Sequence, residues 1–87
     1  MVQLVVALRT NPGRMPTMLE PWELTFEQGM KALTDLAPFL AKEYDGITFR
    51  PITVEGDLIA LEIVSYYGKI ESEDLEGAVN WWVNHRS

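Results

Sequence analysis

The chain has 87 residues, 47% of them hydrophobic, which predicts one small globular domain spanning residues 1–87. It contains no cysteine, which excludes disulfides, thiolate catalysis and cysteine-ligated metal sites, and favours a cytosolic protein. The net charge of -6 reflects 13 acidic and 7 basic side chains, and the basic ones are scattered singly. We therefore expect no direct nucleic-acid binding, which needs clustered lysine and arginine. The apolar runs are far below the ~20 residues of a membrane span, so we expect no membrane association.

The first predicted element is a β-strand over Val2–Arg9, because Val2, Leu4, Val6 and Leu8 alternate with a second, half-apolar face. The Asn-Pro-Gly sequence that follows predicts a turn. Arg14–Leu24 contains two prolines and is predicted to be irregular. A connection of this length is often functional, and the alternative is a flap whose apolar side chains cover one end of the core.

A helix is predicted to begin at Thr25, whose hydroxyl can form a capping box with Gln28. Pro38 removes one backbone hydrogen bond and should bend or split this helix. Gly46 follows its end and can adopt the left-handed conformation that terminates helices. Apolar residues recur every 3 or 4 positions and predict a buried stripe of Phe26, Met30, Leu33, Ala37, Leu40 and Tyr44.

A β-hairpin is predicted from Ile47–Val54 and Leu58–Tyr67. Pro51 cannot donate a hydrogen bond to a neighbouring strand, so its strand should lie at the sheet edge. The second strand is far more apolar and should be central.

The register of this hairpin depends on the length of its loop. A three-residue loop, Glu55 to Asp57, places Arg50 opposite Glu62 and Val54 opposite Leu58. A two-residue Glu55-Gly56 loop would instead place Arg50 among apolar side chains. We favour the first register because it pairs opposite charges and leaves one apolar face.

The last predicted element is a helix capped by Ser72, with acidic residues in its first turn, where the helix dipole favours them. Its buried stripe is predicted to be Leu75, Val79, Trp82 and Val83.

The predicted fold class is α+β, with element order β-α-β-β-α. A right-handed crossover would make the first two strands parallel. With the third strand central and antiparallel to both, the three-stranded sheet has the order 1-3-2. This is a split βαβ arrangement, ferredoxin-like but lacking its fourth strand, with two helices on one face.

No catalytic, cofactor or metal motif can be identified. His85 has no second histidine nearby, and the carboxylates around residues 71–76 lack the alternating spacing of a calcium loop. We therefore expect no cofactor and no metal, and favour a protein without enzymatic activity.

Aromatic residues outside the predicted buried stripes suggest a surface for another protein. At 100° per residue, Phe39 falls on the polar side of its helix and Trp81 lies away from the stripe that contains Trp82, while Trp22 lies in the irregular segment. Tryptophan and tyrosine often carry much of the binding energy at interfaces. The leading hypothesis is an adaptor, inhibitor or regulatory subunit whose contacts are Trp22, Phe39, Trp81, Glu73 and Asp74. The alternative is that the Pro38 bend turns Phe39 inward and that Trp81 covers the edge of the core.

A second hypothesis is a dimeric small-molecule-binding or enzymatic domain. Its open sheet face would line a pocket with Arg50, Glu62, and Tyr66 or Tyr67. The outer edge of Val2–Arg9 has neither proline nor lysine to prevent pairing. We expect either a homodimer through this edge or its coverage by Arg14–Leu24.

Overall fold

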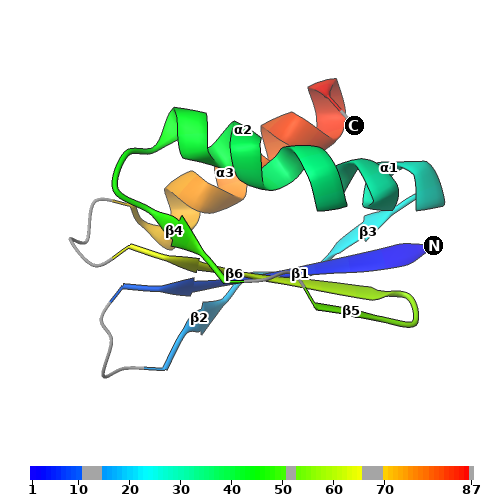
Figure 1. Cartoon of the computed structure of the whole chain (residues 1–87), viewed down its shortest axis with the longest axis horizontal. Coiled ribbons are helices and arrows are strands. Elements are labelled where there is room, and N and C mark those ends of the chain that lie inside the picture. Colours follow the sequence, from blue (N-terminus) through cyan, green and yellow to red (C-terminus); the bar gives the residue numbers. More distant parts are fainter. Residues whose placement is uncertain (11–14, 51–52, 66–69, 87) are drawn as a thin grey trace.

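The protein is a mixed β-sheet covered on one face by two helical segments (Figure 1). The computed structural model describes residues 1–10, 15–50, 53–65 and 70–86. The strands are β1 (Val2–Arg9), β2 (Thr17–Met18), β3 (Trp22–Leu24), β4 (Thr48–Phe49), β5 (Thr53–Glu55) and β6 (Leu58–Val64). The helical elements are α1 (Phe26–Lys31), the π-helical η1 (Ala32–Leu36), α2 (Ala37–Glu43) and α3 (Ser72–His85).

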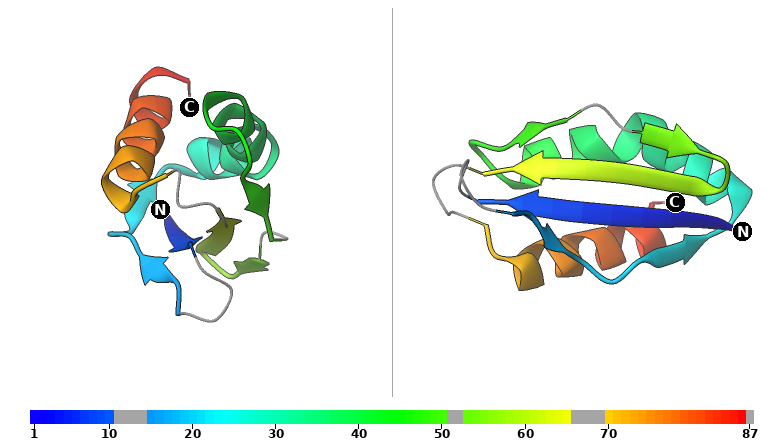
Figure 2. Two further views of the ribbon diagram at one scale, coloured as in Figure 1. Left: turned by 90° about the vertical axis from the view of Figure 1, so that its left-hand side faces the viewer. Right: turned by 90° about the horizontal axis from the view of Figure 1, so that it is seen from below.

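The two long strands, β1 and β6, run parallel at the centre of the sheet, with Gln3 opposite Leu58 and Arg9 opposite Val64. The short strands β2 and β3 pair antiparallel with β1, and β4 and β5 pair antiparallel with β6. The view along the strands in Figure 2 shows both helical segments on the same side of this sheet. The predicted α+β class and the placement of the helices on one face are therefore confirmed.

The predicted three-stranded split βαβ layout is wrong in its strand directions and strand number. β6 was expected to run antiparallel to the first strand, and it runs parallel to it. The cause lies in residues 15–24, where β2 and β3 return the chain along β1 before the helix begins. The helix therefore starts beside the beginning of β1, and the following strands take directions opposite to those of a simple crossover.

The outer edge of β1 is covered by the chain itself. Val2 to Leu4 pair with β3, Ala7 and Leu8 pair with β2, and the Leu19 amide donates to the Val6 carbonyl at 3.0 Å. Of the two expectations for this edge, coverage by the segment after β1 is confirmed. A homodimer through it gains no support.

The hairpin register matches neither predicted loop. Glu55 lies opposite Leu58, so the turn is Gly56-Asp57, and Gly56 has φ of 60°, which favours glycine. Farther along, Phe49 lies opposite Ile63. The pairing has therefore shifted by one residue between β5 and β4.

Because of this shift, the backbone of Arg50 lies opposite that of Glu62, as in the favoured three-residue register. The Arg50 amide donates to the Glu62 carbonyl at 3.0 Å. The predicted charge pair between their side chains is wrong, because the Glu62 carboxylate accepts from Arg9 Nε at 2.7 Å. β6 also ends at Val64, before the predicted boundary at Tyr67. Pro51, Tyr66 and Tyr67 lie outside the described residues.

The first helix begins as its sequence predicts. The Gln28 amide donates to the Thr25 hydroxyl at 3.1 Å, and the Thr25 amide donates to the Gln28 side chain at 2.9 Å, which completes the capping box. Gly46, after the helix, has φ of 76°, as expected of a residue in the left-handed region.

The predicted buried stripe of this helix is wrong in its first half. Phe26 and Met30 are exposed, and Leu33 is only partly buried. The helix instead buries small residues against the sheet, and a Cβ added to Gly29 would lie 3.2 Å from Val2 Cγ1. The buried helical residues are Gly29, Ala32, Leu36, Phe39 and Leu40.

The helix α3 packs as predicted, but its cap differs. Leu75, Val79 and Trp82 are fully buried, while Val83 is partly buried. Glu71, not Ser72, is the N-cap residue, and no side chain bonds to the free amides there.

The core between the two layers is formed by Leu4, Val6, Leu8, Leu24, Ile59, Leu61, Ile63, Ile70 and the buried helical residues. No helix within the described residues is both long enough and apolar enough to cross a membrane.

Candidate functional site

An aromatic cluster joins the outer surfaces of α2 and α3. The rings of Phe39 and Trp81 stack with centroids 5.5 Å apart and planes 6° apart. Trp81 also stacks on His85, one helical turn later, at 4.7 Å. The Arg86 guanidinium lies 5.4 Å from the centre of the Phe39 ring. Trp81 remains 47% exposed at the centre of this cluster, so a large aromatic side chain is held in a defined position at the surface.

Neighbouring residues on α3 explain why Trp81 points outward. Trp82 is fully buried, and its indole nitrogen donates to Asp35 Oδ2 at 2.8 Å. The other oxygen of Asp35 lies 3.6 Å from the Arg86 guanidinium. Because successive residues are rotated by about 100° around a helix, fixing Trp82 in the core leaves Trp81 partly exposed, where it stacks on Phe39 of α2.

A hollow of about 240 Å³ opens beside this cluster. We call it the aromatic hollow, and it is lined by Phe39, Glu43, Tyr44, Ala78 and Trp81. The Tyr44 hydroxyl donates to the main-chain oxygen of Asp74 at 3.0 Å, which ties the end of α2 to the first turn of α3. Burial raises the pKa of the Tyr44 hydroxyl, and the charges of Asp74 and Glu43 raise it further. The hollow therefore combines three aromatic side chains with one carboxylate, that of Glu43.

A second hollow lies at the other end of the cluster and has a different charge. It is lined by Lys31, Thr34, Asp35, His85 and Arg86. The Lys31 ammonium donates to the main-chain carbonyl of Arg86 at 3.3 Å, and the hollow holds two basic side chains against the one carboxylate of Asp35. The exposed surface around Trp81 is consequently acidic toward Glu43 and basic toward Arg86.

The structure brings together two of the five predicted contact residues. Phe39 and Trp81 stack directly, although the prediction that Phe39 lies on the polar face is wrong, because Phe39 is only 7% exposed beneath Trp81. Trp22 is partly buried, and its indole nitrogen donates to Asn80 Oδ1 at 2.6 Å.

The two predicted carboxylates take different positions. Asp74 is placed by its main-chain oxygen, which accepts from the Tyr44 hydroxyl, and its side chain does not line the aromatic hollow. Glu73 lines a separate hollow with Thr10 and Thr17 at the start of α3. Tyr44 and Glu43 were not predicted as contacts; the helical stripe correctly indicated that Tyr44 packs on the core, but not that its hydroxyl reaches α3.

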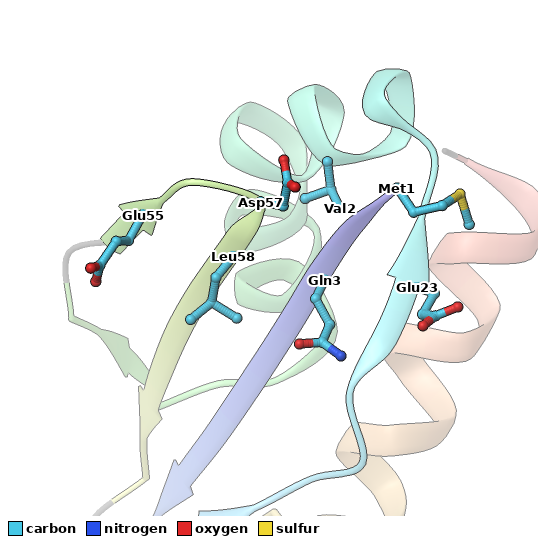
Figure 3. Close-up of a pocket in the computed structure, with 7 residues that line it drawn as sticks. All are labelled: Met1, Val2, Gln3, Glu23, Glu55, Asp57 and Leu58. Carbon is cyan, nitrogen blue, oxygen red and sulfur yellow. The ribbon is translucent and has the colours of Figure 1, made fainter.

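The described residues of the open sheet face form no cluster of stacked rings like that around Trp81. Figure 3 shows the hollow at the beginning of β1, where Glu23 and Glu55 lie on opposite sides of Gln3 and Leu58. Their carboxylates do not converge. Within the described ranges, no group of three or more histidine, aspartate or glutamate side chains could hold a metal ion.

Comparison with known proteins adds no assignment: no protein-family model, no curated protein and no solved structure matches this chain. The geometry of the surface around Trp81 is therefore the basis for a functional proposal.

Proposed function

We propose that this protein acts by binding another protein through the surface formed by Trp81, Phe39 and the aromatic hollow. The observation that carries this proposal is the stacked position of Trp81, which is 47% exposed yet packed between helices. An aromatic side chain that is already ordered loses little entropy on binding, and such residues are frequent anchors at interfaces.

The charge of the chain supports a protein partner of complementary charge. A net charge of -6 on a small domain steers oppositely charged surfaces toward it and raises the association rate. The alternative of a pocket formed by Arg50 and Glu62 gains no support from the described residues. Glu62 pairs with Arg9, and Arg50 is exposed.

The test has two stages. Tagged protein captures candidate partners from the native host, and each candidate is then purified and its dissociation constant measured directly. We expect Trp81→Ala to weaken binding by about 2 kcal/mol or more, which is roughly 30-fold. Phe26→Ala is the matched control, because Phe26 is 70% exposed but lies on α1, away from the cluster. Equal affinities of the wild type and Trp81→Ala for every purified partner would refute the proposal.

A further inference from the structure

We propose that the aromatic hollow receives a lysine or arginine side chain of the partner protein. The aliphatic part of that side chain would lie along Tyr44 and Trp81, and its positive charge would face Glu43, the carboxylate that lines the hollow. This inference rests on the proposed function, because it specifies which chemistry the Trp81 surface recognises.

The size of the hollow fits one side chain. Its volume of about 240 Å³ is below the ~300–1,000 Å³ typical of pockets for whole small-molecule ligands. Its lining suits a long cationic side chain, since lysine and arginine bury their methylene groups on apolar surface while the charged end stays near water. Glu43 is exposed at the hollow, so a bound cation could reach it without being fully desolvated.

The electrostatic surroundings favour a cation over an anion or a neutral group. The pKa of the nearby Tyr44 hydroxyl is raised by burial first and then by the carboxylates of Asp74 and Glu43. The geometry agrees for Glu43, which lines the hollow, while Asp74 contributes its main-chain oxygen to the Tyr44 hydroxyl at 3.0 Å. The adjacent Lys42 is exposed and does not line the hollow.

Charges at the opposite end of the cluster determine on which side of Trp81 a cationic side chain binds. Lys31 and Arg86 line the second hollow, and Arg86 lies over the Phe39 ring. Asp35 lines the same hollow and lies 3.6 Å from Arg86, so one carboxylate stands against two basic side chains and the remaining positive charge disfavours a cationic side chain there. The partner's basic group is thereby confined to the Glu43 side of Trp81.

Two small probes test this inference without a known partner. Nα-acetyl-lysine N-methylamide carries the proposed side chain with its free ammonium group. Nα-acetyl-norleucine N-methylamide has an apolar side chain of similar length without the charge. Each is titrated into the ¹⁵N-labelled protein, and the shifts of the Ala78 amide and the Trp81 indole are followed. We expect saturable shifts with the lysine probe at millimolar concentration. Binding should be about twofold to fivefold tighter than that of norleucine, as for an exposed charge interaction.

Matched variants then assign the charge preference. Glu43→Gln should remove most of the difference between the two probes, whereas Glu76→Gln should preserve it. Both variants lose one exposed carboxylate, but Glu76 does not line the hollow. Equal binding of the probes to the wild type, no saturable shift with lysine, or an equal effect of both variants would overturn the inference. The binding of a purified partner would still be tested separately by Trp81→Ala, so failure here is distinguishable from failure of the proposed function.

Discussion

Trp81 and Trp82 are adjacent and chemically identical, yet their surroundings give them different roles. Trp82 is fully enclosed and bonds to Asp35, so it holds α3 against η1. Trp81 covers Phe39 from outside and keeps nearly half of its surface in water. Its stability contribution is therefore limited to stacking and partial burial, while its exposed part remains available to a partner.

This contrast predicts unequal losses of stability. Trp82→Ala should cost about 3–5 kcal/mol, because it leaves a large cavity and an unpaired Asp35 oxygen. Trp81→Ala should cost less than about 2 kcal/mol, since it removes mainly ring stacking. Urea unfolding followed by circular dichroism measures both. If Trp81→Ala unfolds the protein as readily as Trp82→Ala, Trp81 is a core residue and the proposed interface loses its anchor.

Tyr44 should make stability depend on alkaline pH. Its pKa is raised in the folded state by burial and by the nearby Asp74 and Glu43 carboxylates, whereas the unfolded chain has the ordinary value of about 10. As the pH rises, the Tyr44 hydroxyl therefore loses its proton at a higher pH in the folded state than in the unfolded chain. This contribution is complete below pH of about 10 and is lost as the pH rises through the folded-state pKa.

Comparison with Tyr44→Phe isolates this effect. The variant should lose a fraction of its stability at neutral pH with the hydrogen bond to Asp74, about 0.5–1.5 kcal/mol. Above pH of about 10, the wild type should lose stability more steeply than the variant. Urea midpoints measured from neutral to alkaline pH test this, and parallel curves would show that Tyr44 does not contribute.

At the scale of elements, the π-helical turn η1 explains why some site residues could be predicted and others could not. The helical period placed Trp81 outward and Trp82 inward correctly, because α3 is a regular helix. Phe39 follows η1 and Pro38, where the wider turn changes the facing that 3.6 residues per turn would give. The search for large apolar residues also gave the wrong buried face for the first half of the helix. Gly29 and Ala32 are buried there because the helix approaches the sheet closely, and residues this small do not stand out in a hydrophobic pattern.

The N-termini of α1 and α3 are capped differently, so removing a hydroxyl from each should lower the stability of the protein by different amounts. Thr25→Ala removes an acceptor that the Gln28 amide uses and should cost about 0.5–2 kcal/mol. Ser72→Ala should change stability by less than about 0.5 kcal/mol, because Ser72 makes no capping bond in α3. Thermal melts of both variants provide the comparison, and a larger loss for Ser72→Ala would contradict the observed caps.

At the scale of the whole molecule, the fold depends on elements too short to produce a sequence pattern. The alternation of apolar residues correctly predicted β1. The apolar composition of β6 correctly predicted that it belongs to a hairpin and lies at the centre of the sheet. β2 and β3 have two and three residues, too few for a periodicity to be recognised. Since these strands reverse the chain before the helix, missing them also gave the wrong direction for β6 relative to β1.

The observed sheet predicts a distinctive pattern of hydrogen exchange. β1 is paired on both sides, by β6 and by β2 and β3, so its amides should be among the slowest to exchange, together with those of β6. The amides of β2 should exchange faster, because this short strand lies at the edge. Exchange followed by NMR should be combined with sedimentation at the same concentration, since dimerisation would also protect an edge. A monomer with slowly exchanging β1 amides would match the structure. A monomer in which the β1 amides exchange as fast as those of β2 would show that the β2 and β3 segment does not cover the first strand.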